Sequence, residues 1–318
     1  MNPANENIRA ATVRERWNQP LPYGRGSDDL SCLSSSYAWC ERLARRQAGN
    51  FYHAFRLLPA EQRRAMCALY AFMRVADDLT DGPQAVAEKS LALADWRRQF
   101  DAALDGVYYH SLHPAFHHTV KHFGIPRRYV DDVLDGVGMD LETDRYDTFA
   151  DLYSYCYRVA SAVGLACIHI WGFRDRRALN YAEAAGIALQ LTNILRDLKE
   201  DAARGRVYLP REDLERFGYR VDDLALSRYD ERFRALMRFQ VERARTYYES
   251  AEPLAELLDP AGRSVFLVML RTYRGLLEAI VQRDYDVFTY RVCLSRLRKL
   301  WLAVQVLPLR WGWNNLFV

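Results

Sequence analysis

Two acidic clusters stand where a packed helix should carry apolar side chains. In the first, Asp77 and Asp81 prolong a stripe that begins at Met66 and passes through Tyr70 and Met73. Residues four, seven and eleven positions apart share one face of an α-helix. A buried carboxylate is costly without a cation, so the pair predicts a cation partner. A capped helix end with solvated acids is the alternative that this cluster leaves open.

The second cluster lies on a helix that is otherwise apolar. Gln190, Asn193, Asp197 and Asp201 follow one another at spacings of three or four residues, and Gly186 continues the same face. Hard oxygen ligands in this number suit Mg²⁺, with Mn²⁺ as an alternative. Mg²⁺ takes one or two carboxylates and completes its shell with water and phosphate oxygens. Two such helices facing each other would hold Mg²⁺ ions between them, and the natural third component is a diphosphate.

At these residues the chain resembles the squalene/phytoene synthase family, the head-to-head isoprenyl diphosphate synthases. The resemblance covers about residues 37 to 302 and rests on several motifs together. These are Asp77–Asp81, Asn193–Asp201, Phe51–Pro59, Ala68–Arg74, Tyr155–Gly164 and Gly205–Pro210.

The resemblance implies a fold and a set of site residues. The fold is all-α, a single-domain isoprenoid-synthase helical bundle around a central cavity. Mg²⁺ and diphosphate would be bound by Asp77, Asp81, Asn193, Asp197 and Asp201. Substrate binding or salt bridging would involve Phe51, Arg74, Arg196, Arg206 and Arg291, and the polar positions at the reaction centre would be Tyr70, Tyr155, Gln190, Tyr208 and Tyr273. One departure is Asn50, where many members carry Ser.

The reaction that the resemblance implies is the head-to-head condensation of two allylic prenyl diphosphates. The diphosphate leaves once Mg²⁺ and Arg side chains neutralise its charge, and the allylic cation then needs a dry cavity. The segment Tyr155–Leu165 favours two farnesyl diphosphates giving presqualene diphosphate, with NADPH needed only if the reaction continues to squalene. Tyr285–Phe288 favours the alternative, a phytoene synthase that uses geranylgeranyl diphosphate. The pathway served would be hopanoid or carotenoid biosynthesis, with other isoprenoid enzymes downstream.

Two other classes of protein compete with this interpretation. A chain-elongating prenyltransferase or terpene cyclase would suit Asp77 and Asp81, but the spacing of the second cluster fits it less well. A non-catalytic helical scaffold of the same fold is the second, and the intact acidic motifs argue against it.

The elements that must position these residues are helices. Helical periodicity runs from Ser34 onward between Gly and Pro breakers and predicts roughly eight to eleven helices with essentially no sheet. The segment Phe149–Trp171 would form a cavity wall whose face runs through Tyr155, Val159, Ala162, Val163 and Ala166. Close helix packing by small residues is the alternative for that face.

Composition limits the class of protein and its partners. The chain has 318 residues, 50% of them hydrophobic, and a net charge of +3, which excludes a disordered protein. Basic and acidic residues are interspersed, which disfavours nucleic acid as a partner. Six Cys without a CxxC pair indicate reduced thiols.

Five His are close in sequence: His110, His113, His117, His118 and His122. They include pairs that could bind zinc. An interrupting Pro and the lack of an acidic third ligand favour a plain connector between helices instead.

The expected organisation is a flexible N-terminal arm over 1–33, the isoprenoid-synthase domain over 34–302 and a tail over 303–318. Without an apolar signal segment, the chain is expected to be cytoplasmic. The end of the chain combines three Trp with basic residues, a composition that suits the headgroup region of a bilayer. Peripheral contact with the inner face of the membrane is therefore one expectation, and packing of the tail onto the helical core is the other.

Overall fold

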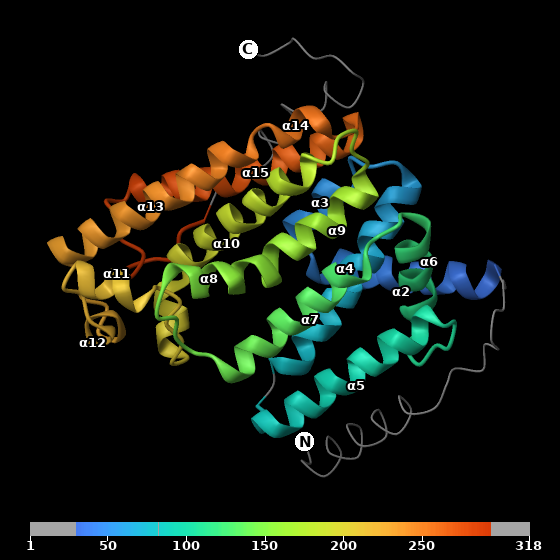
Figure 1. Cartoon of the computed structure of the whole chain (residues 1–318), viewed down its shortest axis with the longest axis horizontal. Helices are drawn as coiled ribbons and strands as arrows, with labels where there is room; N and C mark the ends of the chain where they lie inside the picture. Colours follow the sequence, from blue (N-terminus) through green and yellow to red (C-terminus); the bar gives the residue numbers. More distant parts are fainter. Residues whose placement is uncertain (1–29, 82, 294–318) are drawn as a thin grey trace. The chain divides into compact units, whose positions relative to one another are not determined.

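The computed structural model describes residues 30–81 and 83–293, and helices dominate both ranges (Figure 1). In chain order they are α2 Leu30–Gln47, α3 Asn50–Phe55, α4 Ala60–Thr80, α5 Val86–Leu104, α6 His113–His122, α7 Arg127–Glu142, α8 Phe149–Cys156, the π-helix η1 Tyr157–Ser161, α9 Ala162–Trp171, α10 Ala178–Ala203, α11 Arg211–Arg216, α12 Val221–Ala225, α13 Glu231–Ala251, α14 Leu254–Leu257 and α15 Pro260–Val281. Within these ranges β-structure is limited to two isolated bridges. The all-α class is confirmed.

The sequence predicted the number of long helices but missed the short ones. Ten described α-helices have eight residues or more, within the expected range, and four others have four to six. A helix of one turn shows too little periodicity for a pattern to reveal it. None of the described helices combines the length and apolar composition that a membrane crossing requires.

The described helices divide into two compact units. Unit 1 holds α2, α4 from Arg63 onward, α5 and α6, and unit 2 holds His53–Gln62 and the chain from Ile125. The expected arm and tail fall largely or wholly outside the described residues, and the boundaries of the 34–302 domain stay a prediction.

Unit 1 is built around aromatic side chains of α4, α5 and α6. Phe72 stacks on Phe116 with ring centroids 4.0 Å apart, and Trp96 and Phe100 lie 5.3 and 5.4 Å from Phe72. All four rings are almost fully buried. Because each such ring removes about 150–250 Å² from water, this cluster supplies much of the apolar burial that holds the three helices together.

Two members of the histidine cluster, His110 and His113, have structural roles beside this core. The Nδ1 atom of His113 accepts the backbone N–H groups of Tyr109 and His110, and the Nδ1 atom of His110 accepts that of Leu112. Burial lowers the pKa of His110 to about 4 and that of His113 to about 3. In the part of the chain that the structure describes, no three His, Cys, Asp or Glu side chains are grouped so that they could hold a metal ion.

Unit 2 is organised around α10, the longest described helix. The helices α8, α9, α13 and α15 and the π-helix η1 all contact α10, and Figure 1 shows α13 and α15 running beside it. The buried side chains of α10 include Leu191, Ile194, Leu195 and Leu198. These neighbours cover the apolar faces of α10. The polar strip of α10, from Gln190 to Asp201, stays partly exposed.

The π-helix η1 interrupts the segment Phe149–Trp171, which the sequence predicted as a cavity wall. Its turn is closed by the N–H of Ala162 donating to the carbonyl oxygen of Tyr157, five residues earlier. The wide turn departs from the α-helical period on which the face from Tyr155 to Ala166 was predicted, and that face stays a prediction. Ala162 and Ala166 are fully buried, whereas Val159 is half-buried.

Glycines on two neighbouring helices admit this wide turn. A Cβ atom on Gly186 of α10 would lie 2.4 Å from Cα of Ser161, and one on Gly136 of α7 would lie 2.9 Å from Cβ of Arg158. Distances below 3.0 Å do not occur for real Cβ atoms, so only glycine fits at either contact. Gly186 and Gly136 therefore allow α10 and α7 to pack closely against η1.

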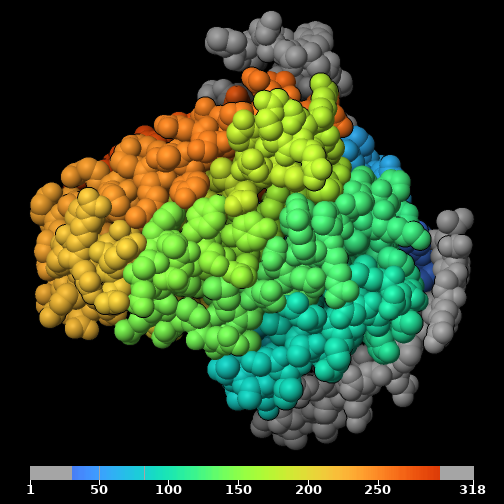
Figure 2. All heavy atoms as spheres, in the orientation of Figure 1, coloured from blue at the N-terminus to red at the C-terminus, as the bar shows by residue number. Residues whose placement is uncertain are grey.

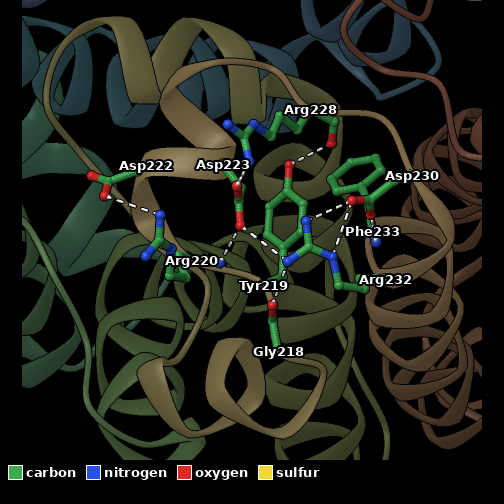
Figure 3. A network of polar contacts seen from close by, with 9 residues as sticks. All are labelled: Gly218, Tyr219, Arg220, Asp222, Asp223, Arg228, Asp230, Arg232 and Phe233. Atoms are coloured by element: carbon green, nitrogen blue, oxygen red, sulfur yellow. Dashed lines mark hydrogen bonds and ion pairs between the residues drawn. The ribbon is translucent and has the colours of Figure 1, made fainter.

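The corner that leads into α13 is held by a network around Asp223 (Figure 3). Asp223, whose side chain is 2% exposed, accepts the N–H of Arg220 at 3.1 Å and the guanidinium groups of Arg228 and Arg232 at 2.9 and 3.4 Å. Tyr219 donates its hydroxyl to the carbonyl oxygen of Arg228. Figure 2 shows the yellow atoms of α11 and α12 against one end of the orange α13. Each of these polar contacts joins two residues of the same network, which indicates a structural role.

Candidate active site

The polar strip of α10 contains the acceptors that the sequence predicted. Gln190, Asn193, Asp197 and Asp201 are all partly exposed, in contrast to the buried apolar faces of the helix. The amide nitrogen of Asn193 donates to Oε1 of Gln190 at 3.4 Å, while its oxygen Oδ1 is buried without a hydrogen-bond partner. An orphaned amide oxygen in line with two carboxylates fits a hard divalent cation.

Two arginines bind the carboxylate of Asp197. Arg196 donates from both Nε, at 2.9 Å, and Nη2, and Arg291 donates from Nε and Nη2 at 3.1 and 2.9 Å. Burial acts to raise the pKa of Asp197, but the hydrogen bonds and charges of these arginines hold that pKa below its ordinary value. Asp197 therefore gathers two permanently charged groups at the middle of the strip.

The segment after α15 positions Arg291. Lys199 on α10 donates to the carbonyl oxygen of Phe288 at 2.7 Å, and the ring of Phe288 packs 4.6 Å from that of Phe233. The short segment Tyr285–Phe288, which favoured the phytoene synthase alternative, thus anchors the chain to α10 and α13 three residues before Arg291.

Asp201 differs electrostatically from Asp197. Burial raises the pKa of Asp201 to about 6, and the charge of Asp197 adds to this effect, while Arg204 and Arg206 act against it. A carboxylate held above its ordinary pKa is a group that gains from a bound cation.

Tyr273 reaches the same strip from α15. It interacts with Asn193 through a side-chain hydrogen bond and with the charges of Arg196 and Asp197, and burial raises its pKa. Tyr273 therefore belongs to the site as the sequence predicted.

Beyond Asp201 lies a cluster of stacked tyrosines. The rings of Tyr155 and Tyr208 are 5.2 Å apart, and Tyr146 lies 5.4 Å from Tyr155 and 6.0 Å from Tyr208. The hydroxyl of Tyr155 donates to that of Tyr208 at 3.4 Å, and Tyr208 donates to Oδ1 of Asp140 at 3.1 Å. The charge of Asp201 acts on the pKa of Tyr208, which places this cluster beside the polar strip.

Short backbone pairings hold this cluster in place. Val207 donates its N–H to the carbonyl oxygen of Asp144 at 2.8 Å, and Arg211 donates to that of Tyr146 at 2.9 Å. Arg206 donates from Nη2 to the carbonyl oxygen of Asp140 at 3.1 Å. The loop after α10 is thereby fixed against the end of α7.

Asp140 and Tyr146 were not singled out from the sequence. Asp140 lies four residues after Gly136 and seven after Val133, both buried on α7. A polar residue on an apolar helix face is the same signal that revealed the strip on α10. For Tyr146, which lies in a loop, no periodic signal exists.

Five predicted residues lie in unit 1, four of them between the middle of α4 and the residue that follows it. Arg74 forms an ion pair with Asp78, one turn later, and its Nε is buried without a hydrogen-bond partner. Tyr70 is half-buried, and burial raises its pKa. Phe51 is half-buried in the first turn of α3.

The acidic cluster of α4 corrects one expectation. Met73 is 9% exposed, but Asp77 and Asp81 are both exposed, so the stripe leaves the core before it reaches them. The carbonyl oxygen of Asp77 accepts the N–H of Asp81 and the hydroxyl of Thr80, which closes the helix. These carboxylates therefore need no buried cation to be tolerated, and any cation they bind is bound at an accessible helix end.

Three comparisons identify the class of protein to which this site belongs. The model of the squalene/phytoene synthase family matches residues 44–298. A 15-cis-phytoene synthase of Synechococcus elongatus is 38% identical over 89% of this chain and 95% of its own length. Phytoene synthase 2 of Solanum lycopersicum is 37% identical over 86% of this chain and 90% of its own.

Solved structures of a dehydrosqualene synthase and a squalene synthase share the fold. A dehydrosqualene synthase in complex with a ligand superposes with a TM-score of 0.79 at 30% identity, over 86% of this chain and 96% of its own. The squalene synthase HpnC of Alicyclobacillus acidocaldarius gives 0.76 at 28% identity, over 80% and 96%. The fold is that of the helical isoprenoid synthases. The chain belongs to the squalene/phytoene synthase family, whose enzymes transfer prenyl groups in head-to-head condensations.

Proposed function

We propose that this chain condenses two molecules of geranylgeranyl diphosphate head to head to give phytoene. The observation that carries the choice is the identity of 36–38% with phytoene synthases of cyanobacteria and plants, over 84–94% of the chain. Farnesyl diphosphate, the substrate that Tyr155–Leu165 favoured, is thereby replaced by the alternative that Tyr285–Phe288 favoured. Because phytoene formation needs no reductant, NADPH has no part in this function.

The proposed metal ligands are Asp77 and Asp81 in unit 1 and Asn193, Asp197 and Asp201 in unit 2. The orphaned oxygen of Asn193, the paired carboxylates four residues apart on α10 and the raised pKa of Asp201 support the second set. Bound Mg²⁺, or Mn²⁺ in its place, would neutralise the charge of the leaving diphosphate. For the first set the support is the spacing of the aspartates and the family motif.

The arginines are proposed to bind the diphosphate. Arg196 and Arg291 already point both of their donor pairs at one anionic group, the carboxylate of Asp197. A guanidinium presents its donors in a planar fork that suits phosphate oxygens as well as carboxylates. Arg74 and Arg206 complete the proposed set, and Tyr70, Tyr155, Gln190, Tyr208, Tyr273 and Phe51 are proposed to line the reaction centre.

The test is incubation of the purified chain with geranylgeranyl or farnesyl diphosphate, with and without Mg²⁺ and NADPH. We expect metal-dependent diphosphate release and a C40 hydrocarbon from the C20 substrate, unaffected by NADPH. Presqualene diphosphate or squalene from the C15 substrate alone would return the function to the first expectation. Release of no diphosphate from either substrate would favour the scaffold. Binding of Mn²⁺, followed by its paramagnetic resonance signal, tests the metal ligands separately and should weaken in Asp201→Asn.

Contact with a membrane and with downstream isoprenoid enzymes forms part of the proposal. A C40 hydrocarbon is insoluble in water, so release into a bilayer gives peripheral contact a use. The segment that would make this contact, residues 303–318, lies outside the described residues.

A further inference from the structure

Tyr155, Tyr208 and Asp140 form a hydrogen-bond chain with one direction. A phenol carries a single hydroxyl hydrogen. Tyr155 uses its hydrogen toward Tyr208, and Tyr208 uses its own toward the carboxylate oxygen of Asp140. An ionised carboxylate can only accept and a guanidinium can only donate, so Asp140, together with Arg206, which also hydrogen-bonds Tyr208, fixes the direction of the whole chain. The oxygen of Tyr155 can therefore meet any further group only with its lone pairs.

The surroundings keep this chain in place. Tyr155 and Tyr208 are 4% and 7% exposed, and their rings stack with an angle of 27° between them. Burial raises the pKa of Tyr155 and brings that of Tyr208 to about 12, so both phenols stay neutral at physiological pH. The chain thus presents a fixed dipole.

The third ring of the stack provides an internal contrast. Tyr146 is 3% exposed and packs against both other rings, but its hydroxyl is buried without a hydrogen-bond partner. Stacking and hydrogen bonding can therefore be separated by experiment, because one tyrosine takes part only in the stacking.

We propose that Asp140 is a positioning residue of the prenyl transfer reaction, which acts through Tyr208 to turn the negative end of the Tyr155 hydroxyl dipole toward the allylic cation. The inference rests on the proposed function, in which Tyr155 borders the reacting carbons. A dipole fixed in advance stabilises developing charge in a dry site far more than in water, since it needs no reorganisation when the charge forms. Without Asp140, the hydroxyl of Tyr208 is free to donate to Tyr155, which reverses the chain and presents a hydrogen to the cation.

The experiment compares five variants with the wild type: Asp140→Asn, Asp140→Ala, Tyr208→Phe, the double variant Asp140→Ala/Tyr208→Phe, and Tyr146→Phe as the matched control. The C20 substrate is used, kcat, KM and diphosphate release in a single turnover are measured, and thermal unfolding monitors the fold. We expect Asp140→Ala and Tyr208→Phe each to lower kcat roughly 10- to 100-fold with KM within about threefold. Asp140→Asn, which keeps an acceptor but loses the charge, should fall between Asp140→Ala and the wild type. Tyr146→Phe should keep the wild-type kcat.

Because Asp140 acts through Tyr208, the losses should not multiply. The kcat of the double variant should stay within about threefold of the kcat of the slower single variant. Multiplicative losses in the double variant would overturn the inference, as would an unchanged kcat in Asp140→Ala. A loss in Tyr146→Phe as large as that in Tyr208→Phe would assign the effect to stacking and also overturn it. If Asp140→Ala does not fold, Asp140→Asn and Tyr208→Phe decide by the same criteria. A wild type that releases no diphosphate would overturn the proposed function and this inference with it, whereas an active wild type with unaffected variants overturns only the inference.

Discussion

At the scale of single residues, Asp197 and Asp201 show how one helix face creates two different acids. Asp197 accepts four hydrogen bonds from Arg196 and Arg291, and its side chain is 18% exposed. Asp201 lies one turn further, where burial and the charge of Asp197 raise its pKa to about 6. Removal of a repulsive carboxylate often leaves folding intact. Of these two acids, only Asp201 has a raised pKa, so only its removal is expected to relieve an unfavourable charge.

The metal-free protein should therefore respond in opposite directions to two substitutions. Asp197→Ala leaves the half-buried Arg196 unpaired and should lower the free energy of unfolding by about 1–3 kcal/mol at pH 7. Asp201→Asn should raise it by ~1 kcal/mol, a value reduced for solvent screening. Chemical denaturation in the presence of a chelator measures both. Equal effects of the two variants would contradict the assigned electrostatics.

The pH dependence of the same protein follows from Asp201. Its pKa is about 6 in the folded state and near the ordinary 3.8 in the unfolded state, so the folded state binds more protons between these values. The contribution of this group to stability must therefore fall as pH rises from about 4 to about 6. Denaturation of wild type and Asp201→Asn across this window should show the difference between them vanish near pH 4. A difference that is constant with pH would contradict the prediction.

At the scale of elements, the π-helix η1 depends on the absence of side chains on its neighbours. Gly186 of α10 and Gly136 of α7 both touch the backbone or Cβ atoms of η1. Since η1 begins two residues after Tyr155, its wide turn determines the direction in which α9 leaves the tyrosine cluster. A π-turn inside an α-helix is often found at a functional site, which agrees with its place here.

Two glycines in the same region should respond differently to a methyl group. Gly186→Ala would bring Cβ to 2.4 Å from Cα of Ser161, so overpacking should lower the free energy of unfolding by about 1–3 kcal/mol. At Gly164, on α9, the nearest atom to a new Cβ is the carbonyl oxygen of Ala182 at 3.5 Å, an ordinary contact. Gly164→Ala should therefore be neutral or up to ~1 kcal/mol stabilising through helix propensity. Thermal unfolding of both variants decides, and a stable Gly186→Ala would mean that η1 shifts at little cost.

At the scale of the whole molecule, the proposed hydrocarbon product has to be released into a membrane. None of the described helices is long and apolar enough to cross one. The end of the chain, with three Trp among basic and aliphatic residues, is the part whose composition suits a bilayer surface. The prediction for this segment rests on the sequence.

Deletion of residues 307–318 should reduce co-sedimentation with vesicles that contain anionic lipid at least severalfold, while binding to neutral vesicles is weak in both proteins. Diphosphate release by the truncated protein serves as the control for folding. Unchanged binding after the deletion, or no binding by the full chain, would eliminate the membrane contact and favour packing of the tail onto the helical core.

The sequence by itself determined what depends on neighbouring residues: the all-α class, the polar strip from Gln190 to Asp201, and through its motifs the family. Helical periodicity is local, and a strip of oxygen donors on an apolar helix is legible without any knowledge of its surroundings. Only the tertiary structure decided that Arg291 binds Asp197 across 94 positions, and that Asp140 and Tyr146 join Tyr155 and Tyr208. It also decided that Asp77 and Asp81 lie outside the core and that a π-turn follows Tyr155. The physical reason is the same in each case: burial, pairing and pKa are properties of what packs against a side chain, and those neighbours come from elements far away in the sequence.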